Sequence, residues 1–268
     1  MKLRELEELI RDNIHGASHI TERALRLLER VSEEERREFS ARLERAHPLM
    51  PSLHLALSLL EKMSAEEILE LFERAHEETV RKTSEIIERS DVIITISNSR
   101  AVRDSLLRSE PRRVFVTESR PVREGELLVK ELRKNGIDAV LITDASIGIV
   151  AEKCTKAVVG GDALTPEYLI NKIGTYPLAL VCREKGIPFY ASVSSFKHTE
   201  KKIKIGDILK DVRDPSEISS EVPSLNIYFD ATPRELVKVI SDASVAQQAE
   251  RVLGKHEVAG SNPARGLK

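Results

Sequence analysis

The sequence predicts an α/β protein in which a helical N-terminal domain precedes a parallel-sheet domain. Apolar residues recur at helical spacing through most of residues 1–89. From residue 90 the period changes, and short apolar runs alternate with helical patterns up to residue 241. This alternation is typical of parallel strands that are buried on both faces and joined by helices. A chain of 268 residues can bury the core of one or two such domains.

Two serines indicate where helices of the N-terminal domain begin. Ser32 and Ser64 are each followed three residues later by a glutamate, Glu35 or Glu67. In such a capping box, the serine hydroxyl accepts a hydrogen bond from an early helical amide, and the glutamate accepts one from the amide of the serine. Stripes of leucine and isoleucine run along the same region. We therefore expect several antiparallel helices in residues 1–89.

Five apolar runs predict the strands of the second domain, with helical patterns such as 126–134 and 174–184 between most of them. The runs are residues 92–96, 114–117, 139–143, 156–159 and 189–193. Parallel strands joined by right-handed crossovers form a single sheet, so we expect a Rossmann-like domain over residues 90–241. Ligands bind such sheets at the carboxyl ends of the strands. The polar residues at or just past these ends are Ser97, Glu118, Asp144 and Asp162.

Composition and charge narrow the classes of function. The net charge of −2 argues against general nucleic-acid binding. No apolar run approaches the roughly 20 residues that span a bilayer, and the chain opens with a charged, amphipathic segment. We therefore expect a cytoplasmic protein without membrane contact. Cys154 and Cys182 have no CxxC spacing, so we expect them to be buried thiols, and we expect neither a metal ion nor a cofactor.

Residues 242–268 differ from the rest of the chain and are expected to form a disordered or non-native tail. The only two glutamines, Gln247 and Gln248, lie there, and no core period continues. The tail segments 245–247 and 260–263 can be encoded by the D-arm and T-arm sequences of a tRNA gene. We therefore expect the reading frame to run into such a gene, which the codons at these positions would test.

One segment has the chemistry of a phosphate site. Gly160 and Gly161 lead from an apolar strand to Asp162, and residues 171–175 are predicted to open the next helix. The first amides of a helix are free donors at its positive end, so they favour a phosphate, and Lys172 would add a charge. Taken alone, however, an aspartate after a strand is more commonly a turn or cap residue.

Six motifs in one order and spacing resemble a known family over residues 16–241. They are residues 116–121 (VTESRP), 141–145 (LITDA), 159–162 (VGGD), 170–175 (INKIGT), 187–190 (IPFY) and 229–233 (FDATP). The family joins the alpha, beta and delta regulatory subunits of translation initiation factor 2B to two sugar-phosphate isomerases. Those isomerases act on ribose 1,5-bisphosphate and methylthioribose 1-phosphate. The resemblance implies a homodimer formed through the sheet domain and a pocket for a phosphorylated small molecule.

Of the two catalytic residues that the resemblance implies, one is present in this chain and the other is replaced. Asp162 matches the catalytic aspartate of the isomerases, but Ser97 stands where they have a cysteine. A serine hydroxyl is a much poorer acid or base than a thiol, and no histidine lies nearby in sequence to activate it. Asp162 is thus catalytic only if the protein is an isomerase. The run from Ser99 to Val102 resembles the Ser-Arg turn of the initiation-factor alpha subunit instead.

Further ligand-binding residues are implied by the same resemblance. Gly16 and Ala17 align with a phosphate-holding Arg-Gly-Ala motif in which His15 replaces the arginine, although Gly16 is equally explained as a helix stop. Glu118 and Arg120 belong to the VTESRP motif, and Lys197 follows the last strand. Arg120 and Lys197 are alternatively solvated surface residues. The remaining expected contacts are Ser97, Asn98, Ser99, Asp162, Asn171, Lys172, Gly174 and Thr175.

From these residues we expect the protein to be a regulatory subunit like those of initiation factor 2B. It would bind a sugar phosphate or a nucleotide monophosphate, and translation initiation factor 2 is a candidate partner. The alternative is an aldose-ketose isomerase acting on ribose 1,5-bisphosphate or a related pentose phosphate. A purely structural interaction module is a third reading, which the polar strand ends disfavour.

Overall fold

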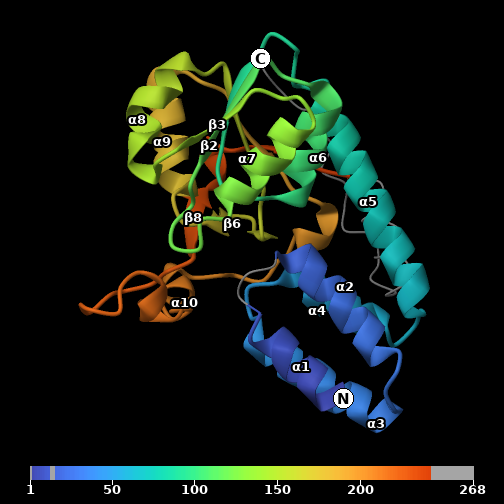
Figure 1. Cartoon of the computed structure of the whole chain (residues 1–268). Coiled ribbons are helices and arrows are strands. Elements are labelled where there is room, and N and C mark those ends of the chain that lie inside the picture. Colours follow the sequence, from blue (N-terminus) through green and yellow to red (C-terminus); the bar gives the residue numbers. More distant parts are fainter. Residues whose placement is uncertain (1, 13–15, 243–268) are drawn as a thin grey trace, which may run out of the picture.

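The computed structural model describes residues 2–12 and 16–242 of the chain. Five helices come first and lie at one end of the molecule, with α5 running up along the sheet (Figure 1). They are α1 (Lys2–Ile10), α2 (Ala17–Leu28), α3 (Glu33–Ala46), α4 (Pro51–Leu59) and α5 (Ala65–Glu85). The expected tail lies outside the described residues except for Asp242, which is fully buried.

Both capping boxes predicted in the helical region are confirmed. The Ser32 hydroxyl accepts from the Glu35 amide at 3.2 Å, and the Glu35 carboxylate accepts from the Ser32 amide at 2.9 Å. Ser64 and Glu67 repeat the arrangement with the same two distances at the start of α5. Behind these caps, leucines of α1 to α5 form one apolar cluster that also includes Phe196 from the second half of the chain.

A six-stranded parallel sheet forms the second half, as the sequence predicts. The strand order is β3-β2-β1-β4-β7-β9, and every neighbouring pair is parallel. Five strands match the five apolar runs, and β9 is an unpredicted sixth. Their bounds are β1 (Val92–Thr95), β2 (Arg113–Thr117), β3 (Ala139–Ile142), β4 (Lys156–Val159), β7 (Phe189–Ser192) and β9 (Lys238–Ile240).

Helices cover both faces of this sheet. The helices α6 (Arg100–Ser109) and α7 (Gly125–Lys134) bury Val102, Leu106, Leu128 and Leu132 against one face. The helices α8 (Ile147–Val150) and α9 (Thr175–Lys185) cover the other face. Cys154 and Cys182 lie in this second core as buried thiols, which confirms the expectation from their spacing. The result is the three-layer arrangement of a doubly wound fold.

A small antiparallel sheet, which the sequence did not predict, lies beside the main one. Its order is β5-β6-β8, formed by β5 (Ala163–Leu164), β6 (Tyr168–Lys172) and β8 (Phe229–Pro233). Asn171 and Lys172 are therefore the end of a strand, where they pair with Asp230 and Phe229, and they do not open a helix. The helix α9 starts only after Gly174, whose φ of 102° breaks the strand.

The remaining elements are short turns and one projecting arm. The arm carries α10 and extends away from both sheets (Figure 1), and it exposes Ile205, Leu209, Val222 and Leu225. The short elements are η1 (Asp144–Ser146), η2 (Ala151–Lys153), η3 (Ser195–Lys197), α10 (Ile205–Ile208), η4 (Pro215–Glu217) and η5 (Arg234–Leu236). Within residues 2–12 and 16–242, no helix is both long and apolar enough to cross a membrane.

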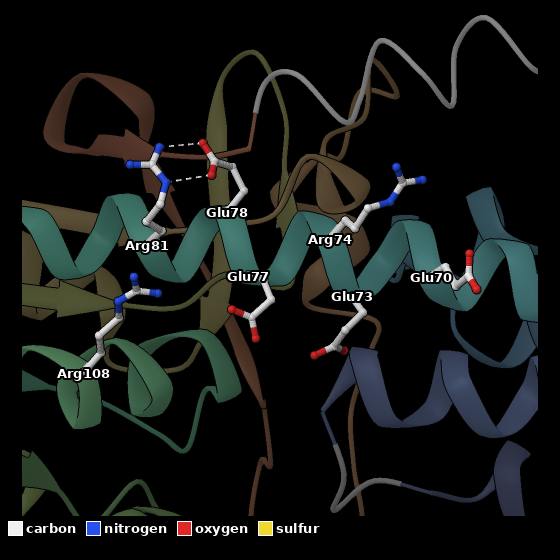
Figure 2. A pocket seen from close by; sticks show the side chains of 7 residues that line it. All are labelled: Glu70, Glu73, Arg74, Glu77, Glu78, Arg81 and Arg108. Carbon is white, nitrogen blue, oxygen red and sulfur yellow. Dashed lines mark hydrogen bonds and ion pairs between the residues drawn. The ribbon is translucent and has the colours of Figure 1, made fainter.

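Helix α5 presents a charged face to the outside. A hollow of about 660 Å³ lies along it, as Figure 2 shows. Some of the charges there pair with each other, as Arg81 does with Glu78 at 2.7 Å. The lining residues are Glu70, Glu73, Arg74, Glu77, Glu78, Arg81 and Arg108. None of the site residues predicted from the sequence is among them, so the candidate site lies elsewhere.

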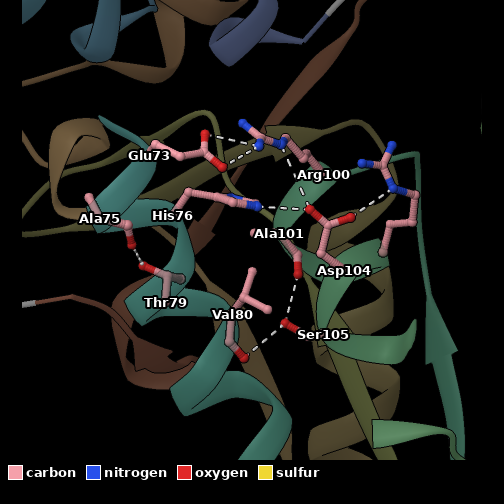
Figure 3. Close-up of polar contacts among 10 residues, drawn as sticks. Glu73, Ala75, His76, Thr79, Val80, Arg100, Ala101, Asp104 and Ser105 are labelled. Atoms are coloured by element: carbon pink, nitrogen blue, oxygen red, sulfur yellow. Dashed lines mark hydrogen bonds and ion pairs between the residues drawn. The ribbon is translucent and has the colours of Figure 1, made fainter. Parts of the chain in front are cut away.

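The part of α5 that carries Glu73 and His76 also contacts the start of α6. In Figure 3, His76 Nε2 lies 2.8 Å from Asp104 Oδ2, and Arg100 donates to Glu73 at 2.7 Å. The Ser105 hydroxyl donates within its own helix to the carbonyl oxygen of Ala101 at 2.7 Å. Arg100 is the first residue of α6, so this network ties the long helix α5 to the segment that follows β1.

Candidate functional site

The strand order creates a crevice between β1 and β4. From β1 the chain winds outward through β2 and β3 and then returns to β4 on the other side of β1. At such a switch point the loops after the two central strands diverge and leave an opening at their carboxyl ends. The loop after β1 carries Ser97, Asn98 and Ser99, and the loop after β4 carries Asp162. The fold thus brings four of the predicted site residues to one edge.

Close contact between the two loops requires glycine at position 160. A Cβ atom built on Gly160 would lie 2.5 Å from the Ser99 hydroxyl oxygen and 4.0 Å from the Asn171 side-chain oxygen. Ser99, Gly160 and Asn171 therefore meet at the floor of the crevice. The carbonyl oxygen of the Asn98 side chain is buried there without a hydrogen-bond partner among the described residues. Polar groups of this kind are open to a ligand.

Ser97 is held in an uncommon backbone conformation. Its φ of 68° is left-handed, and its amide donates to the Ser119 hydroxyl at 2.8 Å. Ser119, at φ 63°, is fixed in turn because its amide donates to Asp144 at 2.8 Å. Left-handed backbone at residues other than glycine costs energy and is concentrated at functional sites. Asp144, which the sequence predicted as a polar residue at the ligand-binding end of a strand, therefore holds this turn.

A carboxylate joins Ser97 to Lys172. The Ser97 hydroxyl donates to Glu124 Oε1 at 2.9 Å, and Lys172 Nζ lies 3.0 Å from the same oxygen. The side chains of Lys172 and Glu124 are only 7% and 15% exposed. Lys172 Nζ also lies 4.5 Å from the centre of the Tyr228 ring, while Glu124 Oε2 is buried without a partner in the described part of the chain. Ser97, Glu124 and Lys172 thus form a buried polar chain.

Asp162 lies near two lysines, Lys197 and Lys172, whose charges act on its carboxyl group. Burial raises the pKa of Asp162, while the charges of Lys197 and Lys172 act to lower it. Lys197 Nζ donates to the carbonyl oxygen of Gly161 at 2.7 Å. Burial lowers the pKa of Lys197, and the charge of Asp162 acts against that. The predicted residues Asp162 and Lys197 are thereby brought together.

The start of α9 does not offer free amides to a phosphate, which corrects the prediction made from Gly174 and Thr175. Asp230 of β8 reaches over this helix end, where its Oδ2 accepts from the amides of Gly174 at 2.9 Å and Tyr176 at 3.0 Å. The Thr175 hydroxyl bonds to the Lys172 carbonyl oxygen at 2.6 Å. A bound carboxylate already satisfies these donors, and its charge would repel a second anion.

Asp230 makes the stability of the protein depend on pH. Burial raises its pKa to about 6, although the helix amides that it caps act to lower it. A carboxyl group that binds its proton more tightly in the folded state stabilises the fold fully below its unfolded pKa of about 3.9, and it loses this contribution as pH rises through 6. Relative to Asp230→Asn, we expect the wild type to lose up to about 3 kcal/mol of unfolding free energy between pH 4 and pH 7. Urea unfolding of both proteins across this range measures the difference, and parallel curves would contradict the assignment.

The remaining predicted residues have structural contacts. Glu118 pairs with Arg123 at 3.8 Å, and Arg120 is exposed while its amide donates to Asp144 at 2.8 Å. The Asn171 side chain donates to Thr175 at 3.0 Å. Gly16 caps α2 and Ala17 is buried at its start, whereas His15 lies outside the described residues. The ligand role of these residues stays a prediction.

Two functional candidates were missed from the sequence. Glu124 precedes Gly125 in a charged turn that resembles any solvated loop, so nothing local distinguished it. Asp230 lies in the FDATP motif, whose resemblance to the family was noted without a role for the carboxylate. Both act through partners that are distant in sequence, since Ser97 and Glu124 are 27 positions apart and Gly174 and Asp230 are 56 positions apart.

The fold and the crevice define a doubly wound α/β protein with a polar switch-point site. The chain belongs to the initiation factor 2 subunit family, whose model matches residues 13–247. This confirms the family resemblance that the motifs indicated.

Members of this family with different names are similarly related to the chain. A translation initiation factor eIF-2B subunit 2-like protein of Pyrococcus horikoshii is 33% identical over 256 residues, covering 88% of this chain and 92% of that protein. A ribose 1,5-bisphosphate isomerase of Archaeoglobus fulgidus is 32% identical over 270 residues, covering 88% and 86%. The crystal structure of a translation initiation factor eIF-2B from P. horikoshii OT3 has a TM-score of 0.81 at 31% identity, covering 90% of this chain and 95% of that one.

Proposed function

We propose that the protein is a regulatory subunit like those of initiation factor 2B and that it binds a phosphorylated small molecule in the switch-point crevice. The observation that carries the proposal is the meeting of Ser97, Ser99, Asp162 and Lys197 at the carboxyl ends of β1 and β4. Hydroxyl and carboxylate groups suit a sugar, and a lysine suits a phosphate. A sugar phosphate or a nucleotide monophosphate has both parts.

The start of α6 supports a phosphate position better than the start of α9. Ser99 is the N-cap of α6, and its side chain makes no capping hydrogen bond. The Ser99 side chain therefore leaves the first amides of this ten-residue helix without a cap at the positive end of the helix dipole. We therefore expect the phosphate at the start of α6, which follows β1, and not at the start of α9, which follows β6.

If a ligand binds in the crevice, it should raise the melting temperature of the protein. We expect a phosphorylated pentose or a nucleoside monophosphate at 100 times its Kd to stabilise the fold by about 2.7 kcal/mol. The unphosphorylated sugar or nucleoside should give a much smaller shift, because the charge-assisted contacts are lost. Lys197→Ala should reduce the shift, whereas Lys201→Ala on the exposed loop should leave it unchanged. An equal shift with the unphosphorylated compounds, or no shift with any probe, would count against the proposal.

A second candidate, an aldose-ketose isomerase, is favoured by the contact between Ser97 and Glu124. The sequence indicated no base near Ser97. In the structure, however, the Glu124 carboxylate accepts a hydrogen bond from the Ser97 hydroxyl at 2.9 Å. With Asp162 in the loop after the neighbouring strand β4, two groups could exchange protons with a bound sugar. However, Glu124 Oε1 already lies 3.0 Å from Lys172, and a serine hydroxyl remains a weak acid.

We therefore expect turnover well below about 1 s⁻¹ on ribose 1,5-bisphosphate and on methylthioribose 1-phosphate. A direct assay of both substrates decides between the two functions. Faster turnover that Asp162→Asn abolishes and Glu124→Gln lowers by about 10² or more would establish the isomerase instead. Binding without turnover would support the regulatory subunit.

We further propose a homodimer formed through the sheet domain, contact with translation initiation factor 2, and a cytoplasmic location. The dimer and the partner rest on the family resemblance alone, because the exposed Leu127 and Ile149 lie on helices that cover opposite faces of the sheet. The proposed boundary between the domains, near residue 90, is supported by the gap between the end of α5 at Glu85 and the start of β1 at Val92.

A further inference from the structure

Three consecutive residues of the η3 turn contact three different parts of the molecule. Ser195 binds Asp242 at the end of the sheet, and Lys197 binds the Gly161 carbonyl oxygen beside Asp162. Phe196, between them, is 2% exposed and belongs to the apolar cluster of the helical region. Because the three residues are consecutive, a shift of the backbone at one of them displaces the other two.

The aromatic residue is firmly embedded among the helices. The ring of Phe196 lies 4.1 Å from that of Phe72 on α5, measured between centroids, at an interplanar angle of 31°. Helix α4 also packs against the turn. Because a packed core has little free volume, Phe196 cannot shift without rearranging its neighbours.

Asp242 anchors the other side of the turn. Its carboxylate is fully buried and accepts from the Ser195 amide at 2.7 Å, the Ser195 hydroxyl at 2.5 Å and the Thr79 hydroxyl at 3.0 Å. Thr79 lies on α5, and the next turn of that helix is held by a 2.8 Å contact between the hydroxyl groups of Thr83 and Ser192. A buried carboxylate is costly unless donors satisfy it, so its three donors define one arrangement of α5, η3 and the sheet end.

We propose that Asp242 is a positioning residue that sets the η3 turn, and that this turn couples occupation of the crevice to the packing of the helical domain. The coupling rests on the proposed function, because it assumes a ligand that engages Lys197. An anionic group that draws Lys197 away from the Gly161 carbonyl oxygen removes the contact that ties the η3 turn to the loop after β4, and the turn then shifts together with Phe196. The helical core then responds as a unit, since packed interfaces move between discrete arrangements.

The positioning role is tested without any ligand. Lysine side chains are ¹³C-methylated, and the Lys197 resonance is recognised by its absence in Lys197→Arg. Asp242→Ala and the milder Ser195→Ala should move this resonance toward that of a solvated lysine. The matched controls Asp91→Ala and Thr155→Ala should leave it unchanged, since they break a similar buried contact of 2.6 Å beside the other end of the sheet. An unmoved resonance in the folded Ser195→Ala protein, or equal movement in the controls, would overturn the assignment.

The coupling is tested with ribose 1,5-bisphosphate as the probe. Asp242→Ala should weaken binding of the probe about tenfold. The affinity of Asp242→Asn should lie between those of the wild type and Asp242→Ala, because one side-chain oxygen is retained. Saturating probe should alter hydrogen exchange in α4 of the wild type and of Asp91→Ala, but not of Asp242→Ala. Binding without any change in α4 overturns the coupling. If the wild type binds none of this probe, ribose 1,5-bisphosphate is excluded as the ligand, and the lysine resonance alone decides the role of Asp242.

Discussion

Replacing Gly125 by alanine should destabilise the fold by more than about 3 kcal/mol, the upper part of the range for overpacked positions. The added Cβ atom would lie 1.9 Å from the carbonyl oxygen of Thr117 and 3.0 Å from its carbonyl carbon. Thr117 cannot move aside, because it is the fully buried last residue of β2 and pairs with Ile142 of β3. The clash is with backbone, so no rotamer change relieves it.

Gly148 provides the matched control for this substitution. It also lies in a helix, but a Cβ atom there would meet nothing within 4 Å. Gly148→Ala should be neutral or stabilise the fold by about 0.4–1 kcal/mol through the unfolded state. Urea unfolding of both variants gives the comparison, and a Gly125→Ala protein within 1 kcal/mol of the wild type would contradict the packing argument. Any fraction of Gly125→Ala that folds should have Glu124 displaced from Ser97.

The main sheet was predictable because its signals are local. Each of the first five strands is a run of apolar residues whose neighbours in sequence supply the helices, and the serine caps lie within three residues of their partners. The second sheet has no such signal. Its strand β5 has only two residues, and Asn171 becomes part of a strand by pairing with Asp230, far along the chain. Propensity is overridden where pairing is non-local.

In the candidate site, too, residues with a local sequence signal could be predicted and their distant partners could not. Ser97 and Asp162 could be predicted, because polar residues at the ends of parallel strands converge whatever the loops do. Their partners could not, since Glu124 reaches the site from a turn before α7 and Asp230 reaches α9 from β8. The predicted free helix end at Thr175 failed for this reason, because a carboxylate from a distant strand already occupies it.

Replacing Lys172 by alanine should lower the free energy of unfolding by about 3–5 kcal/mol, the usual cost of removing one partner of a buried ion pair. The sequence predicted Lys172 as a charge beside a phosphate, at the opening of a helix. Instead, the residue is 5% exposed, lies 3.0 Å from Glu124, and stacks 4.5 Å from the centre of the Tyr228 ring. Its removal leaves the Glu124 carboxylate buried without a counter-charge and removes a cation–π contact as well.

Two comparisons separate this burial effect from the loss of any lysine. The double variant Lys172→Met with Glu124→Gln removes both charges and should recover most of the stability, because no uncompensated charge remains. Lys185→Ala breaks an ion pair of 2.9 Å with Glu152, whose side chain is 64% exposed, and should change stability little. If Lys172→Ala unfolds at the same urea concentration as Lys185→Ala, Lys172 is not a buried partner of Glu124, and a direct role in ligand binding becomes the better explanation for its position beside Asp162.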